Sequence, residues 1–209
     1  SLAESTLRIK DLSALIFGDK QPAAAITDTN NMFGALEFAQ TLSGVGIQPI
    51  MGAQINLKDA QGLGEVVLLA KNEIGYVNLS KLLSKTLLEA EATHDPACVL
   101  DDLAALAEGL LLLTGGAIAG FVGGPAGDGR PGLAMSRARK LADIMRDQIY
   151  VELQRHGLAV EKAAEPCLLD IADQLNLPLV ATNDCRFENA EMSQPHDTLV
   201  CIGTGFKFS

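Results

Sequence analysis

The sequence is poor in cysteine, and the few it has are not paired. Its 209 residues include only four cysteines, at positions 98, 167, 185 and 201, and no two of them form a CxxC pair. Neither a zinc knuckle nor a disulfide framework is therefore indicated. Three of the four lie in apolar stretches, which is typical of plain buried thiols.

Basic residues are also scarce. Lys and Arg number 16 against 26 Asp and Glu, which gives a formal net charge of −10 and a sequence pI near 4.7. Because non-specific affinity for nucleic acid comes mainly from Lys and Arg, we expect no direct DNA binding by this chain. A hydrophobic content of 48% and a mean hydropathy of +0.20 indicate a compact globule. This length suffices for one core, so we expect a single domain over residues 1–209.

Membrane and secretory signals are lacking. Residues 103–122 have the length of a membrane span, but Glu108 and the Gly115-Gly116 pair interrupt them. A short helix, a buried strand and a glycine-rich surface loop explain each interruption, so no membrane is expected as a partner. No Gly-Lys-Ser/Thr follows the glycines, which disfavours a phosphate cradle. No basic region followed by an apolar stretch opens the chain, and we expect a cytoplasmic location.

Strand and helix patterns alternate along the sequence. Strands are expected over residues 23–27, 50–57, 65–70, 110–113, 148–154 and 177–182, with a polar, hairpin-like loop over residues 58–64. Helices are expected over residues 5–17, 32–44 and 76–87, from 101, and over 134–146, 164–175 and 196–202. Such alternation predicts an α/β fold with a parallel sheet that closes, or nearly closes, into a barrel.

The carboxyl ends of parallel strands share one mouth, where ligands bind. The apolar run at 23–26 leads into Thr27-Asp28-Thr29 and then into a helix, so these polar side chains are expected at that mouth. His156 and the run 183–186 follow two later strands and are expected at the same place.

Seven motifs give the chain a specific resemblance to one family. They are Ser-Leu-x-Glu at residue 1, Ile-Thr-Asp-x-x-Asn-Met-Phe-Gly at 26, Gly-Ile-x-Pro-Ile-x-Gly at 46, Leu-Leu-Ala-Lys-Asn-x-x-Gly-Tyr-x-Asn-Leu at 68, Gly-Leu-Leu-Leu-Leu-Thr-Gly-Gly at 109, Glu-Leu-Gln-Arg-His-Gly at 152, and Leu-Pro-Leu-Val-Ala-Thr-Asn-Asp at 177. The chain resembles the PHP (polymerase and histidinol phosphatase) domains of bacterial DNA polymerase III alpha subunits. The resemblance implies a distorted (β/α)7 TIM-like barrel whose first strand, with its His-x-His pair, is missing from this chain.

The resemblance also marks the positions at which metal-binding members of the family hold divalent ions. Seven such positions fall within this sequence: Glu4, Thr29, Gln54, Glu65, His156, Asp184 and Arg186. Glu4, His156 and Asp184 are residue types that can still ligate a metal. Glu65 stands where the family has histidine and could ligate in its place.

The remaining three positions have lost their ligands. Thr29 and Arg186 stand where the family has histidine, and Gln54 stands where it has glutamate. A guanidinium cannot ligate a cation and its charge repels one, so Arg186 is expected to pair with Asp184 or Glu4 instead. Metal sites rarely tolerate such losses together. We therefore expect a vestigial site with no metal, no other cofactor and no catalytic residue.

The resemblance implies a part in DNA replication. The parent protein would be a DNA-directed DNA polymerase, a nucleotidyltransferase whose catalytic aspartates and Mg²⁺ belong to a polymerase domain outside this chain. We expect the chain to serve as a structural and docking module, with the remainder of the alpha chain and the proofreading exonuclease (epsilon) subunit as partners.

Two other functions are open on the sequence alone. One is an active metal-dependent phosphoesterase or 3′–5′ exonuclease that uses Glu4, Glu65, His156 and Asp184. The other is an unrelated barrel enzyme that acts on a small phosphorylated metabolite.

Overall fold

A computed structural model describes residues 7–90, 96–187 and 189–204. The chain divides into two compact units. The larger unit consists of residues 27–32 and 51–183, and the smaller one consists of residues 1–26, 33–50 and 184–209. No finding tests the expectation of a single domain, which stays a prediction.

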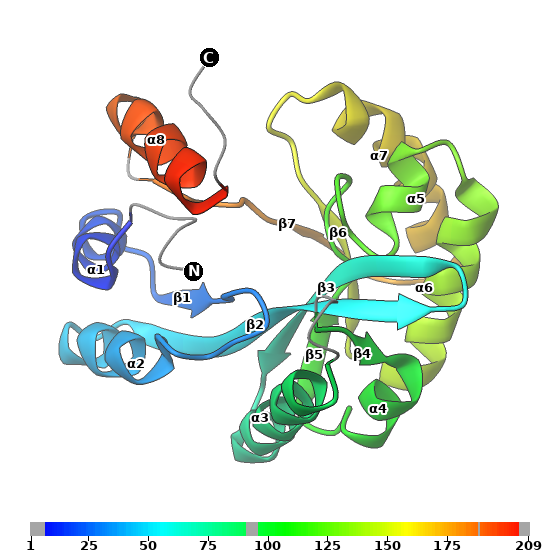
Figure 1. The fold of residues 1–209 in the computed structure, drawn as a ribbon, viewed down its shortest axis with the longest axis horizontal. Helices are drawn as coiled ribbons and strands as arrows, with labels where there is room; N and C mark the ends of the chain where they lie inside the picture. Colours follow the sequence, from blue (N-terminus) through cyan, green and yellow to red (C-terminus); the bar gives the residue numbers. More distant parts are fainter. Residues whose placement is uncertain (1–6, 91–95, 188, 205–209) are drawn as a thin grey trace. The chain divides into compact units, whose positions relative to one another are not determined.

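The larger unit contains a mixed sheet and a set of helices (Figure 1). Its strands are β2 (Gln48–Asp59, from residue 51 onward), β3 (Gly62–Ala70), β4 (Cys98–Val99), β5 (Leu110–Leu113), β6 (Ile149–Leu153) and β7 (Leu179–Ala181). Its helices are α3 (Glu73–Leu88), α4 (Leu100–Ala105), α5 (Gly123–Gly127), α6 (Pro131–Met145) and α7 (Ala159–Leu175). The strands lie in the order β2-β3-β5-β6-β7, and β4 pairs with β2.

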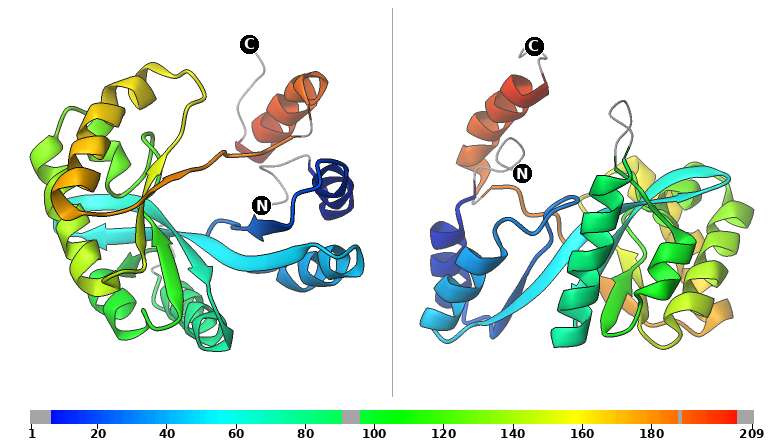
Figure 2. Two further views of the ribbon diagram at one scale, coloured as in Figure 1. Left: turned by 180° about the vertical axis from the view of Figure 1, so that it is seen from behind. Right: turned by 60° about the horizontal axis from the view of Figure 1, so that its bottom comes forward.

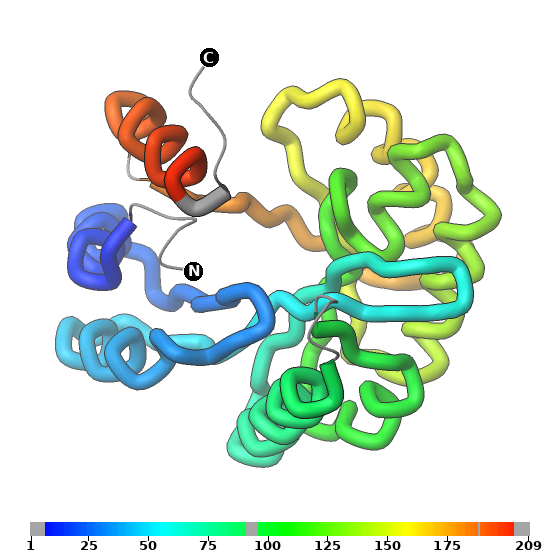
Figure 3. The backbone as a smooth tube through the Cα atoms, viewed as in Figure 1, coloured from blue at the N-terminus to red at the C-terminus, as the bar shows by residue number. Residues whose placement is uncertain are grey.

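The sheet is not parallel throughout, which corrects the prediction from the sequence. β2 pairs antiparallel with β3, and β3 pairs antiparallel with β5, whereas the pairs β5–β6, β6–β7 and β2–β4 are parallel. The cause is a tight hairpin at residues 60 and 61, since Asp59 already pairs with Gly62 (Figure 3). Much of the predicted loop before residue 65 is therefore strand. The two-residue strand β4 was not predicted at all.

The helices cover one face of this sheet. Alternate residues of the strands are buried there, as expected from the period of two in a strand. The strand residues in this core are Ala53, Ile55, Leu57, Val66, Leu68, Leu110, Leu112, Ile149 and Val151. They pack with buried residues of α3, α4, α6 and α7, which lie along the sheet in both views of Figure 2.

The glycine-rich stretch after β5 is packed inside the larger unit, so the prediction of a flexible surface loop is wrong. Thr114, Phe121 and Val122 are fully buried, and α5 follows them. The glycines permit close backbone contacts, because a Cβ on Gly64 would lie 2.5 Å from Cα of Phe121. Gly115, at φ +83°, would place a Cβ only 2.2 Å from the carbonyl oxygen of Glu65. The loop is thus a buried layer against β3.

The apolar stretch 103–122 divides among α4, β5 and this loop, in agreement with the short helix and buried strand that its interruptions predict. Among the described residues, no helix is both long and apolar enough to cross a membrane.

The smaller unit contains α1 (Ile9–Gly18), β1 (Ala23–Ile26), α2 (Ala35–Gly44), the start of β2, a 3-10 helix at Ala190–Met192 and α8 (Ser193–Thr204). Its core is formed by Ile16, Phe38, Leu42 and Ile47. The backbone N–H of Gln48 donates to the carbonyl oxygen of Pro22 at 2.9 Å, which holds β1 beside the start of β2.

A buried arginine on α6 ties three parts of the larger unit together. The Arg137 side chain is 2% exposed and forms a fork with Asp59, with Nη2–Oδ1 at 2.8 Å and Nε–Oδ2 at 3.2 Å. Its Nη1 donates to the carbonyl of Phe121 and its Nη2 to that of Gly62, each at 3.1 Å. The guanidinium also lies 4.1 Å from the centre of the Phe121 ring. Helix α6 is thereby joined to the hairpin tip and to the glycine-rich loop.

These contacts change the pKa of Asp59. Burial by itself raises the pKa of the Asp59 carboxyl, but the hydrogen bond from Arg137, with the Gln61 N–H and the charges of Arg137 and Lys140, holds that pKa below its ordinary value. The carboxylate is therefore charged at neutral pH and needs the arginine beside it.

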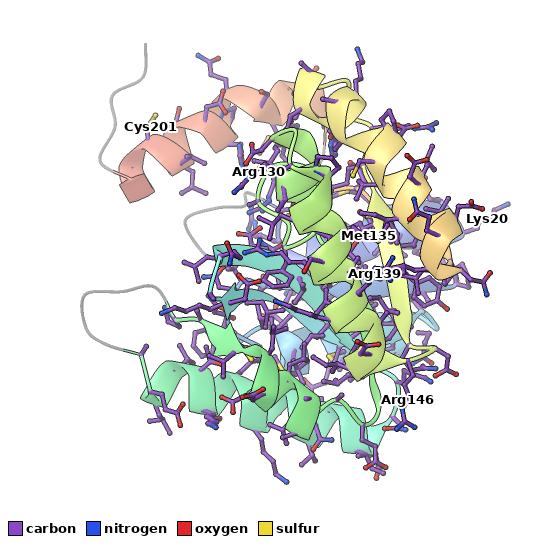
Figure 4. The ribbon with its side chains drawn as sticks, turned by 90° about the vertical axis from the view of Figure 1, so that its right-hand side faces the viewer. Lys20, Arg130, Met135, Arg139, Arg146 and Cys201 are labelled. Carbon is purple, nitrogen blue, oxygen red and sulfur yellow. The ribbon has the colours of Figure 1, made fainter. Side chains whose placement is uncertain are left out.

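We predict that Arg137→Met lowers the free energy of unfolding by about 3–5 kcal/mol, because it leaves Asp59 buried without its partner. The matched control is Arg139→Met, on the exposed side of the same helix (Figure 4), which should change it by no more than about 0.5 kcal/mol. Urea unfolding curves of both variants measure the difference. Equal losses in the two variants would show that the buried pair is not needed.

Candidate functional site

The face of the sheet opposite the core carries polar residues. Asn56 of β2 lies directly opposite Glu65 of β3, and Gln54 lies opposite Val67. Their neighbours Ile55 and Val66 point to the core. Two sequence-predicted site residues, Gln54 and Glu65, therefore share one face of the hairpin.

Thr29 and Gln54 are brought together, as the sequence predicts. Thr29 forms a parallel bridge with Gln54, in which the N–H of Asn30 donates to the Gln54 carbonyl at 2.8 Å and the N–H of Gln54 to the Asp28 carbonyl at 3.2 Å. Asn30 has a φ of +55°, and its Oδ1 accepts a 3.3 Å bond from the N–H of Asn56. The turn after β1 is thus fixed on β2 by backbone bonds and one side-chain amide.

Glu65 is held in place by the glycine-rich loop. Its N–H donates to the Ala119 carbonyl, and its carbonyl accepts from the Phe121 N–H, each at 2.8 Å. Two backbone hydrogen bonds therefore fix Glu65 to the loop.

The end of β6 contains a buried carboxylate that the sequence analysis did not single out. Glu152 is 4% exposed, and its Oε2 accepts from the N–H of Gly115 at 3.1 Å. Its Oε1 accepts from the Gln154 amide at 3.1 Å and from the Thr182 hydroxyl. The N–H of Glu152 donates to the Thr114 hydroxyl at 3.0 Å. We call these five residues the Glu152 network. The only sequence signal for it was the Glu-Leu-Gln spacing before His156.

His156 lies between two side-chain oxygens of the larger unit. Its Nδ1 is 2.6 Å from Oε1 of Glu161, and its Nε2 is 2.5 Å from Oδ1 of Asn183. Oε2 of Glu161 accepts from the N–H of Leu158 at 3.0 Å, so this carboxylate also closes the first turn of α7. Burial raises the pKa of Glu161, but the His156 ring and the Leu158 N–H outweigh burial and hold that pKa below its ordinary value.

Asp184 and Arg186 belong to the smaller unit, where they pair with each other. Nε of Arg186 lies 2.7 Å from Oδ1 of Asp184. The prediction that Arg186 pairs with one of these carboxylates is thereby confirmed for Asp184. Glu4 lies outside the described residues.

The donor set of the larger unit suits hydrogen bonding better than metal binding. Thr29 and Gln54 offer a hydroxyl and a neutral amide, and both ring nitrogens of His156 already face side-chain oxygens. Within residues 7–90, 96–187 and 189–204, no group of three or more His, Cys, Asp or Glu side chains is assembled in a way that could hold an ion.

The cysteines show no sign of a redox site. All four are free thiols; Cys98 is buried, Cys167 and Cys201 are half-buried, and Cys185 is exposed. Burial raises the pKa of the Cys98 thiol to about 12, which leaves it protonated and unreactive at neutral pH.

Comparison with known proteins decides the family. A family model described as "PHP domain" matches residues 1–156, well over half of the sequence. The chain belongs to the PHP domain family. The resemblance seen in the sequence motifs is confirmed.

Curated relatives of this PHP domain are replication proteins. It is 37% identical over 213 residues to DNA polymerase III subunit alpha of Caulobacter vibrioides, 38% over 206 to that of Rickettsia felis, and 36% over 208 to that of Pseudomonas aeruginosa. Each alignment covers 98% of this chain but only 17–18% of the relative. The PHP domain chain thus spans less than a fifth of the length of these proteins.

Two solved structures share the fold. One, from Bifidobacterium adolescentis and assigned as a metal-dependent phosphoesterase, has a TM-score of 0.58, is 13% identical and covers 89% of this chain and 85% of its own. The other is an amidohydrolase from Chromobacterium violaceum, with a TM-score of 0.55, 9% identity and coverage of 94% and 93%. At these identities they establish a mixed α/β fold similar to theirs and carry no evidence about activity.

We predict that Thr114→Val destabilises the PHP domain by about 1–3 kcal/mol, because it leaves the buried N–H of Glu152 without an acceptor. Val matches the shape of Thr, so packing is kept. The control is Thr114→Ser, which retains the hydroxyl and should unfold closer to the parent in urea. A Val variant at least as stable as the Ser variant would remove the network from the account of stability.

Proposed function

We propose that this chain is the PHP domain of a replicative DNA polymerase III alpha subunit, and that it serves there as a structural and docking module. The support is similarity over 98% of the chain to polymerase alpha subunits from several bacteria. DNA synthesis, and the Mg²⁺ that it needs, would belong to the remainder of the subunit. A cytoplasmic location goes with this proposal.

The proposal treats the family's metal site as dismantled. The observation that carries it is the state of His156, whose two ring nitrogens both face oxygens of Glu161 and Asn183. A metal-bound histidine needs one nitrogen lone pair directed at the ion and typically gives the other N–H to a carboxylate. Glu161 supplies that second contact here, while an amide occupies the side where an ion would bind.

The other positions agree with this interpretation. Thr29 and Gln54 bring no negative charge to the polar face, and Arg186 carries a fixed positive charge that Asp184 neutralises. The Glu152 network has satisfied its carboxylate with hydroxyl, amide and backbone donors. Hydrogen-bond donors within the protein thus balance these carboxylates, as metal ions would in a metal-binding relative.

The architecture we propose is a distorted (β/α)7 TIM-like barrel, of which the first strand would lie outside this chain. With a net charge of −10, direct DNA binding is not part of the proposed function. The proposed partners are the remainder of the alpha chain and the proofreading exonuclease (epsilon) subunit.

An active phosphoesterase is the second candidate, and it would use Glu4, Glu65, His156 and Asp184, the positions that could still ligate a metal. Against it, His156 faces Glu161 and Asn183, and Asp184 pairs with Arg186, whereas metal sites need several carboxylate or imidazole ligands free to bind the ion. We therefore rank it below the docking role.

The docking role predicts a complex between this chain and the proofreading exonuclease of the same bacterium. Titration by fluorescence anisotropy of the labelled exonuclease should give a saturable curve with a Kd of about 1 μM or tighter. The full alpha polypeptide is the positive control, and the same polypeptide lacking residues 1–209 should bind far more weakly. Unchanged binding after that deletion would contradict the docking role.

A further inference from the structure

Helix α3 carries an apolar face that is turned away from the sheet. Its inner residues Leu79, Leu82 and Leu83 are buried in the core, whereas Leu88 is 86% exposed and Val77 is 47% exposed. A shallow, open depression runs along this outer side and is lined by α3 and its C-cap alone. We call it the α3 groove and define it by its lining residues, which are Tyr76, Val77, Ser80, Lys81, Ser84, Lys85, Leu88 and Glu89.

The groove has the shape that another helix would fit. Tyr76, Ser80, Ser84 and Leu88 follow at intervals of four and form one row along α3, in which large residues at the ends flank two small ones. The Ser80 hydroxyl donates to the Tyr76 carbonyl at 2.9 Å, and the Ser84 hydroxyl to the Ser80 carbonyl at 2.8 Å. Because both serine hydroxyls already donate to carbonyls of α3, a partner that packs on these two small side chains does not have to supply hydrogen bonds to them.

The motif around α3 leaves one of its residues without a role inside the domain. Asn72 caps the helix by accepting from the Gly75 N–H at 2.9 Å, and the Asn78 amide donates to the Glu108 carbonyl at 2.9 Å. Gly75 allows contact with Gly109, because a Cβ there would lie 1.9 Å from the Gly109 oxygen. Tyr76, by contrast, is 44% exposed and lies in the groove.

The charge of Lys81 indicates which kind of partner fits the groove. Among the described residues, Lys85 pairs with Asp102 at 2.6 Å and with Glu89 at 3.9 Å, so both of these lining charges are balanced, but no ion pair is seen for Lys81. A second copy packed antiparallel across the two serines would bring both Lys81 side chains to the symmetry axis, where they repel. A helix with a carboxylate opposite Lys81 would instead gain an ion pair.

The size of the curated relatives indicates where that helix comes from. This chain covers only 17–18% of them, so under the proposed function more than four-fifths of the polypeptide lies outside it. Apolar surfaces of this kind are typical of permanent interfaces, and a domain of the same polypeptide is a permanent neighbour. We propose that the α3 groove binds an amphipathic helix, with a carboxylate facing Lys81, from the polymerase-bearing remainder of the same alpha polypeptide.

The test is thiol labelling of the full alpha polypeptide, purified without other subunits. Ser84→Cys places a thiol on the groove floor, and the matched control Ser136→Cys places one on the exposed side of α6. Maleimide labelling of each site is followed by peptide mass spectrometry. Ser84→Cys should react at least about tenfold more slowly than Ser136→Cys, because a covered thiol reacts only when the interface opens. Adding Lys81→Glu to the Ser84→Cys variant should restore much of the labelling rate, because the new carboxylate would repel the partner's.

Each other outcome overturns the proposal. Equal labelling rates at the two sites in the full polypeptide would mean that the groove is open. Protection that appears only after the exonuclease is added would assign the groove to a separate protein, and protection that depends on polypeptide concentration would assign it to a second copy. Primer extension by the same samples tests the proposed function independently, so its failure cannot be mistaken for an open groove.

Discussion

The larger unit depends on a single guanidinium buried between a helix and a hairpin. Arg137 donates to Asp59, Gly62 and Phe121, which come from the hairpin tip and from the glycine-rich loop. Because the same loop binds the backbone of Glu65 and supplies Gly115 to Glu152, the position of the polar face follows from this contact. A buried charge pair costs desolvation, and here four hydrogen bonds from the guanidinium to Asp59, Gly62 and Phe121 offset that cost.

The polar face follows the same rule. In a metal site, ions neutralise clustered carboxylates, but in this domain internal donors do so. Glu152 is satisfied by a threonine, an amide and a backbone N–H, and Glu161 is held by His156 and the Leu158 N–H. Apolar side chains remain exposed on the outer side of α3, among them Val77 and Leu88. A domain whose buried polar groups are hydrogen-bonded internally, and whose surface keeps exposed apolar side chains, is suited to assembly.

The sequence predicts most of this fold because local patterns carry it. The run Leu110–Leu113 becomes β5 within its predicted bounds, and the helices over 134–146 and 164–175 are found with small shifts at their ends. A hairpin-like loop was predicted before residue 65, but the antiparallel direction of β2 and β3 was not, because the turn residues Ala60 and Gln61 are not typical turn formers. The burial of the glycine-rich loop was also not predicted, because glycine is common both in flexible loops and where backbone segments pack closely.

The site was predictable only in part. The motif positions marked Thr29 and Gln54 as parts of one site and predicted that Arg186 pairs with Asp184 or Glu4. In the structure Thr29 lies next to Gln54, and Arg186 pairs with Asp184. Glu152 and Glu161 could not be found this way, because a carboxylate in a strand or in a first helical turn is usually a solvated residue, and only tertiary packing buries these two. The partners of His156 lie 5 and 27 residues away, so its state is a property of the fold.

The central claim is that the PHP domain of this polypeptide holds no metal. The most direct measurement is the zinc, iron and manganese content of the full alpha polypeptide, grown with these metals, dialysed without chelator and analysed by plasma mass spectrometry. The polypeptide lacking residues 1–209 serves as the reference. We predict no difference between the two in ions per chain. An excess of one or more ions in the intact polypeptide, lost on deletion of the domain, would contradict the account.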